Sequence, residues 1–154
     1  MRDDRHVELV RAPQHLASVP YAYAAVAGGG FRFVFTAGAS PLDETGSIVG
    51  GADVQCQAEQ VMSNLSVALE ASGARLEDVV KTTVYVASND RADLVAAGDV
   101  VRRHFGRHDA PSTLVGVTML GYAGQLVEVE AIAALPDQGT VPGGPPIGGA
   151  LTAR

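Results

Sequence analysis

The stretch QLVEVEAIAALP, residues 125–136, alternates like a β-strand although it contains two glutamates. Side chains two positions apart in a strand point to the same face of the sheet. One face of this strand would carry only Val and Ala, whereas the other would combine Glu128 and Glu130 with Leu126 and Ile132. The second face is too polar for a core and too apolar for plain solvent. We therefore expect it to line a polar pocket between stacked subunits.

The composition indicates one globular domain without a nucleic-acid or membrane partner. Of the 154 residues, 47% are hydrophobic and 18% are charged, which is typical of a soluble domain. The formal net charge of −6 argues against nucleic acid, because a phosphate backbone attracts a basic surface. Cys56 is the only cysteine, so neither an internal disulfide nor a cysteine zinc cluster is expected. The start is too polar for a signal peptide, and no apolar run is long enough for a membrane helix, so we expect a cytoplasmic protein.

Hydrophobic periodicity predicts two helices and five strands. Apolar residues recur at helical spacing between a possible N-cap, Asp53, and Gly73, and again up to Phe105. The strands are expected at 21–27, 31–38, 79–87, 112–120 and 125–134. The first two strands flank a GGG turn and are expected to pair as a hairpin. The order ββαβαββ predicts an α+β fold in which two helices cover one face of a mixed sheet.

We expect residues 1–135 to form a single domain, with the polar residues 1–19 packed loosely. Residues 136–154 are dense in Pro and Gly and show no period. This composition is typical of a flexible tail that contributes nothing to the core.

Four segments resemble the reactive-intermediate deaminase (Rid, YjgF-like) family. They are VPYAYA (19–24), the run 33–87 with GARLEDVVKTTVYV at 73–86, HFGRHDAPST (104–113) and VEVEAIA (127–133). The resemblance covers most of the chain. It implies a chorismate-mutase-like fold and a homotrimer whose three sheets form a central barrel. It also implies hydrolysis of enamines or imines without a cofactor, in clefts between subunits that hold small carbonyl or carboxylate ligands.

The resemblance also assigns roles to single residues. Glu128 matches the glutamate that orients the attacking water, and Tyr21 matches a tyrosine of the pocket. The arginine that clamps the substrate carboxylate is replaced by Ser112, and no arginine lies between Arg107 and Arg154. The serine, cysteine and asparagine of the family pocket are replaced by Ala37, Leu114 and Gly98. We expect a roomier or more apolar pocket, and a larger or uncharged substrate rather than a standard amino-acid-derived imine.

We interpret Glu128 as the catalytic residue and Tyr21, Ser112 and Thr113 as substrate-binding residues. Each has a structural alternative. Glu128 could sit at a solvated barrel mouth or pair across the trimer, and Tyr21 could pack on the hairpin. Ser112 and Thr113 could simply fill strand positions. Glu130 is interpreted as a structural partner for a donor at an interface.

The two histidines His104 and His108 lie four residues apart near the end of the second helix. No third ligand is evident, so the sequence favours helix capping and predicts no metal site. Two classes of function follow from the sequence. One is a cofactor-free enzyme that acts on a small reactive metabolite by water addition or hydrolysis. The other is a non-catalytic trimer that binds or senses a small molecule.

Overall fold

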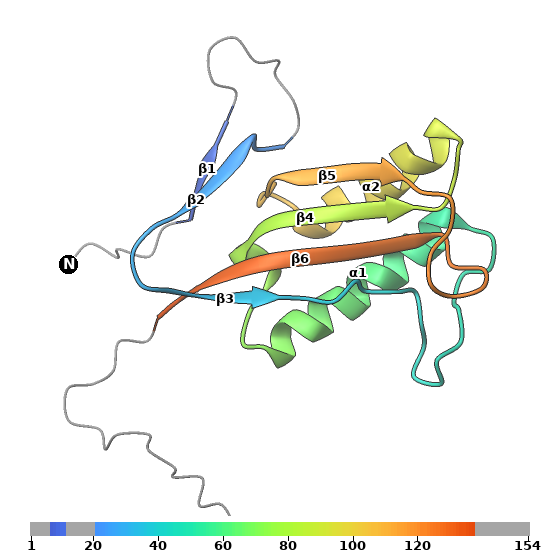
Figure 1. Cartoon of the computed structure of the whole chain (residues 1–154), viewed down its shortest axis with the longest axis horizontal. Coiled ribbons are helices and arrows are strands. Elements are labelled where there is room, and N and C mark those ends of the chain that lie inside the picture. The colour runs from blue at the N-terminus through green and yellow to red at the C-terminus, as the bar shows by residue number, and fades with distance from the viewer. Residues whose placement is uncertain (1–6, 12–20, 138–154) are drawn as a thin grey trace, which may run out of the picture.

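The structure is a computed structural model that describes residues 7–11 and 21–137 (Figure 1). Two long helices and six strands account for most of the described chain. The strands are β1 (Val7–Val10), β2 (Ala24–Ala27), β3 (Phe31–Phe35), β4 (Val79–Val86), β5 (Ser112–Gly116) and β6 (Val127–Pro136). The helices are α1 (Val54–Ala71), α2 (Arg91–Phe105) and a 3-10 turn, η1 (Leu76–Asp78). The predicted α+β class is confirmed, with one additional strand, β1, before the predicted order.

A four-stranded mixed sheet forms the centre of the molecule, in the order β3-β6-β4-β5. β6 runs antiparallel to both β3 and β4, whereas β4 and β5 are parallel. Figure 1 shows α1 and α2 on the same side of this sheet. Among the described residues, no helix lies on the other side of the sheet, which we call the uncovered face. The predicted arrangement of the two helices is therefore confirmed.

The prediction that the first two predicted strands, 21–27 and 31–38, pair as a hairpin is wrong. β2 pairs with β1 in a separate two-stranded sheet, and β3 pairs with β6. β6 extends to Pro136 and offers β3 five partner positions, with Val34 opposite Ala133. This pairing places Val34 against the core, which a hairpin with β2 would not do. Among residues 1–19, Val7–Val10 form β1, whose residues are half-buried or exposed, and residues 1–6 and 12–19 lie outside the described residues. The loose packing of this segment stays a prediction.

Strand ends differ from the prediction at the last two strands. β5 ends at Gly116 rather than 120, and β6 covers 127–136 rather than 125–134. Pro136 is tolerated because it is the last residue of its strand. The tail predicted from residue 136 therefore begins inside β6. Its remainder, residues 138–154, lies outside the described residues, so its flexibility stays a prediction.

Local signals explain where the helices begin and end. The Asp53 side chain accepts a hydrogen bond from the Cys56 amide, as an N-cap does, and Gly73 follows with φ of 80°. Asp90 caps α2 in the same way, and the Gly106 amide closes its C-terminus. Neither described helix has the length and apolar character needed to cross a membrane.

The two histidines contact other elements rather than capping α2 together. His104 Nε2 lies 2.6 Å from Glu59 Oε2 of α1, and His108 Nε2 lies 2.6 Å from the Val79 carbonyl. The hydrogen bond with His104, and the charges of His104 and Arg103, lower the pKa of Glu59. The His104 contact links the two helices at the surface, whereas the His108 contact joins the loop after α2 to the start of β4. Within residues 7–11 and 21–137, no group of three His, Cys, Asp or Glu side chains could hold a metal.

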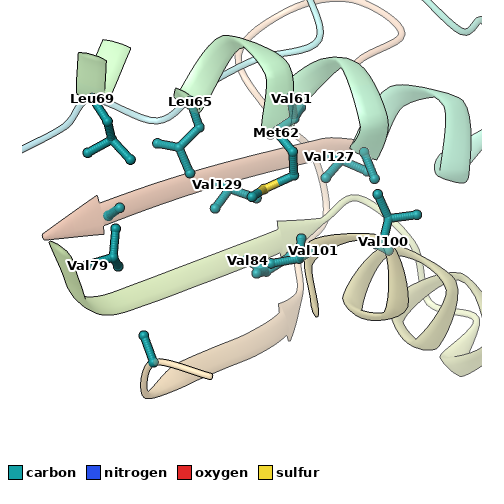
Figure 2. Packing of buried hydrophobic residues seen from close by; sticks show 14 of the residues in the cluster. Val61, Met62, Leu65, Leu69, Val79, Val84, Val100, Val101, Val127 and Val129 are labelled. Carbon is teal, nitrogen blue, oxygen red and sulfur yellow. The ribbon is translucent and has the colours of Figure 1, made fainter. Parts of the chain in front are cut away.

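The core lies between the helices and the apolar face of β6. Four residues of that face are at most 2% exposed, namely Val127, Val129, Ala131 and Ala133. α1 supplies Met62, Leu65 and Leu69, which Figure 2 shows pointing toward the sheet. The alternation predicted for β6 is confirmed, since Glu128 and Glu130 are only half-buried. Leu126 is the exception: it precedes the strand and packs against the core.

We expect Leu65→Ala to destabilise the protein by about 2–5 kcal/mol, because Leu65 is fully buried and its truncation leaves a cavity. Val67→Ala is the matched control on the same helix, because Val67 is 65% exposed. That change should alter the free energy of unfolding by less than about 1 kcal/mol. Urea unfolding of both variants measures the difference, and equal losses would contradict this assignment of the core.

Candidate functional site

The uncovered sheet face brings the two glutamates of β6 beside aromatic and polar side chains. The β4–β6 register places Glu128 opposite Tyr85 and Glu130 opposite Thr83. Farther along the sheet, β3 adds Phe33 and Phe35, which are 52% and 73% exposed. A face that mixes exposed phenylalanines with carboxylates matches the surface predicted from the sequence. Such a patch marks an interaction surface more often than a solvent surface.

The Glu128 carboxylate is held by two neighbours. Gln125 is 3% exposed, and its Nε2 donates to Glu128 Oε2 over 2.9 Å. The Tyr122 amide donates to Gln125 Oε1 over 3.1 Å, which fixes the orientation of the Gln125 amide. On the other side, a Cβ added to Gly38 would overlap Glu128 Oε1. Glycine at position 38 therefore leaves the space that this carboxylate occupies.

A buried glutamine of α1 fixes the loop that carries Gln125. Gln57 Nε2 donates to the carbonyls of Gly51 (2.6 Å) and Gly124 (2.8 Å). Its Oε1 accepts from the Leu126 amide over 2.7 Å. All hydrogen-bonding groups of the Gln57 amide thus serve backbone groups, which fully buried polar atoms require. The core helix therefore determines the start of β6 and, through Gln125, the direction of Glu128.

The second glutamate has a different partner. The Tyr85 hydroxyl donates to Glu130 Oε1 over 2.8 Å, and this bond raises the pKa of Tyr85. A hollow of about 190 Å³ adjoins it, between Phe35, Lys81 and Glu130. The interpretation of Glu130 as the partner of a donor agrees with this bond, although the donor belongs to the same chain.

A larger cavity, of about 450 Å³, lies between α2 and β5, on the helix side of the sheet. Its lining includes Tyr21 and Ser112, together with Gly98 and Leu114. A Cβ at Gly98 would meet Leu114 Cδ2 at 3.2 Å. Leu114 therefore occupies part of the space that a larger side chain at position 98 would need. Gly98 and Leu114 give this part of the wall an apolar surface, and the expectation of a roomier or more apolar pocket stays a prediction.

The predicted substrate-binding residues of β5 serve opposite faces. Ser112 Oγ accepts from Thr82 Oγ1 over 2.8 Å on the cavity side. Thr113 Oγ1 instead accepts from Lys81 Nζ over 2.6 Å on the uncovered face. The cavity thus brings together Tyr21 and Ser112, while Thr113 and Glu128 lie on the other side of the sheet. Adjacent residues of a strand point to opposite faces, so the sequence alone could have predicted that Ser112 and Thr113 do not share a site.

Three charged residues of the cavity were missed in the sequence. Asp99 and Arg102 of α2 line its wall, as does Asp109 in the loop before β5. Asp109 pairs with Arg11, which anchors the end of β1; the hydrogen bond with Arg11 lowers the pKa of Asp109. Asp99 and Arg102 follow Gly98 within the next turn or so of the helix. Gly98 was already assigned to the pocket, so the closeness of Asp99 and Arg102 to it in the sequence could have identified them as lining residues.

Comparisons with known proteins agree with this architecture. A family model described as Endoribonuclease L-PSP matches residues 12–135. The Rid-family protein YyfB of Yersinia pestis superimposes with a TM-score of 0.75 and 30% identity, covering 83% of this chain and 98% of that one. The chain is a member of the Rid family.

Two further relatives of this Rid-family protein are similar over most of its length. A RutC family protein of Pyrococcus horikoshii is 40% identical over 115 residues, 74% of this chain and 86% of the relative. Reactive Intermediate Deaminase A of Arabidopsis thaliana, a chloroplastic protein, is 34% identical over 130 residues, 84% of this chain and 65% of the relative. The resemblance that the sequence strings carried is therefore confirmed at the level of the family.

We expect Gly38→Ala to displace the Glu128 carboxylate and break its bond with Gln125, because the added methyl group overlaps Oε1. The added Cβ would overlap Cδ and Cγ of Glu128 as well as Oε1, so the side chain has to move from Cγ outward and stability should fall by about 1–3 kcal/mol. Displacement of the carboxylate should lower any Glu128-dependent turnover by about 100-fold. A crystal structure of the variant and its turnover measure both effects.

The matched control for this variant is Gly121→Ala, because a Cβ at Gly121 meets no atom within 4 Å. It should leave both the carboxylate and the turnover unchanged. An unmoved Glu128 in the Gly38 variant would show that the carboxylate is not confined there.

Proposed function

We propose that this Rid-family protein is a cofactor-free enzyme that adds water to a small reactive metabolite, an enamine, an imine or a related carbonyl compound. The reaction would take place in a cleft between the subunits of a homotrimer. The small-molecule partner and the expected cytoplasmic location belong to the same proposal. The relative named as a reactive intermediate deaminase supports this class of substrate.

The observation that carries the proposal is the division of the candidate residues between two faces of one sheet. Tyr21 and Ser112 line the cavity between α2 and β5, whereas Glu128 lies on the uncovered face. The sheet separates Glu128 from Tyr21 and Ser112. A ligand in the cavity of one chain would therefore contact the Glu128 of a second copy. The exposed Phe33 and Phe35 give the uncovered face the apolar area that such a contact buries.

The proposed chemistry needs one carboxylate and one water molecule. Glu128 accepts a proton from water as the oxygen attacks the carbon of the C=N group. That proton is then delivered to nitrogen, which gives a carbinolamine. Glu128 next takes the proton of the new hydroxyl group and passes it to nitrogen as the C–N bond breaks, so that a carbonyl compound and ammonia leave. A general base of this kind has to be oriented, and the bond from Gln125 serves that purpose. Tyr21, which lines the cavity, would donate a hydrogen bond to the substrate.

Ser112 supports the rival function, a trimer that binds a metabolite without converting it. A serine cannot provide the charge with which the family arginine holds a carboxylate. The two functions differ in whether ammonia is released from a bound imine. A role on RNA, suggested by the description of the family model, is disfavoured by the net charge of −6.

We expect Glu128→Gln to lower ammonia release from a panel of freshly generated imines by at least about 100-fold, because the amide cannot accept the proton of water. Glu130→Gln is the matched control two residues along the same strand, and it should retain turnover. Both variants should sediment as the wild type does. Unchanged ammonia release by the Glu128 variant would remove the assigned role, and wild-type binding without release would favour the rival function.

We expect wild-type protein to sediment with three times the mass of one chain, and Phe35→Glu to sediment as a single chain. Phe35 is 73% exposed on the uncovered face, and a charge there would have to be buried at the subunit contact. Val67→Glu, on the solvent side of α1, is the control and should remain trimeric. Sedimentation velocity distinguishes the species. A wild type that sediments as a single chain would contradict the shared site.

A further inference from the structure

The cavity between α2 and β5 combines an apolar body with one guanidinium at its wall. Val84, Val95, Phe105 and Leu114 supply apolar lining, and Arg102 supplies the only positive charge among the described lining residues. A cavity of about 450 Å³ with few polar groups suits a small organic ligand. The N–H donors of Arg102 that have no partner in the part of the chain that the structure describes indicate which chemical group the ligand should carry.

Arg102 is oriented by one hydrogen bond that leaves most of its N–H donors available. Its Nη2 donates to Asp99 Oδ1 over 2.8 Å, one helical turn earlier. A guanidinium has five N–H donors in a planar fork, so this single bond leaves donors for another acceptor. The Arg102 side chain is 53% exposed, which leaves it accessible from the cavity mouth. Asp99 therefore holds the side chain near the wall while part of the fork stays available.

The other acid at the cavity does not oppose a negative ligand, because it is already neutralised. Asp109 forms an ion pair with Arg11 of the N-terminal sheet. The two acids of the wall, Asp99 and Asp109, thus each have an arginine partner. An incoming carboxylate would meet balanced charge and available guanidinium donors, and bidentate pairing with arginine is stronger than a neutral hydrogen bond.

We infer that Arg102 is the anion-binding residue of this cavity and that its ligand is a small monocarboxylate with an apolar body. α2 thereby provides from another element the charge that Ser112 on β5 lacks. The apolar contact between Leu114 and the surface at Gly98 favours a hydrocarbon or aromatic body over a polar one. The inference rests on the proposed function because it concerns the same cavity, and it replaces the expectation of an uncharged substrate.

The test compares two stable probes of the same shape, 3-phenylpropanoate and 3-phenylpropanamide, by NMR chemical-shift titration at low ionic strength. Low salt keeps the exposed charge effective. The acid should bind the wild type, and Arg102→Gln should weaken its binding by about 10- to 100-fold, as loss of a charged hydrogen bond does. The amide should bind wild type and variant equally. Arg102→Lys should fall between them, because an ammonium keeps the charge and loses the fork.

Arg103→Gln is the matched control, since Arg103 is the next residue of α2 and pairs with Glu59 of α1 over 2.7 Å. It removes the same charge from the same helix and should leave the affinity for the acid unchanged. Equal affinity of the wild type for acid and amide would overturn the inference. Equal losses in the Arg102 and Arg103 variants, or no binding of either probe, would overturn it as well.

Binding of an unreactive probe does not require Glu128, so the two proposals fail separately. Full turnover by the Glu128→Gln variant would leave the Arg102 result standing. Conversely, an Arg102→Gln variant with unchanged affinity would leave the glutamate-assisted addition of water intact and would place the anion site elsewhere.

Discussion

The two-residue period of β6 is the constraint on which the rest of the structure depends. Its Val and Ala residues are buried beneath α1 and α2, where each buried valine contributes about 1.5–3 kcal/mol and each alanine less. Once that face is committed to the core, Glu128 and Glu130 have to point to the other side. Burial of the small aliphatic residues of β6 thus determines the face of the sheet on which the two carboxylates lie.

Polar order on the uncovered face derives from the same core. Gln57 of α1 reaches through the buried layer to the backbone on both sides of Gln125, and Gln125 holds Glu128. The glutamate is therefore coupled to a helix that it never touches. Glu130 takes its hydrogen bond from a neighbouring strand instead, through Tyr85. Glu128 and Glu130 therefore accept hydrogen bonds from different kinds of donor, an amide and a phenol.

Sequence reasoning succeeded where the signal was local. The N-cap at Asp53, the glycine at position 73 and the alternation of β6 depend on neighbours within a few residues, and all three are confirmed. It failed for the N-terminal strands because the GGG turn signal is local while the partner of β3 lies about a hundred residues away. It also grouped Ser112 with Thr113, although the strand period assigns adjacent residues to opposite faces.

The sequence by itself determined the fold class and the family resemblance, because these reside in residue types and their spacing. Only the tertiary structure decided that Arg102 shares a cavity with Tyr21 and Ser112, and that Glu128 lies across the sheet from them. Contacts between distant elements depend on how whole surfaces pack against one another. No spacing within one element encodes which residue of another element will face it.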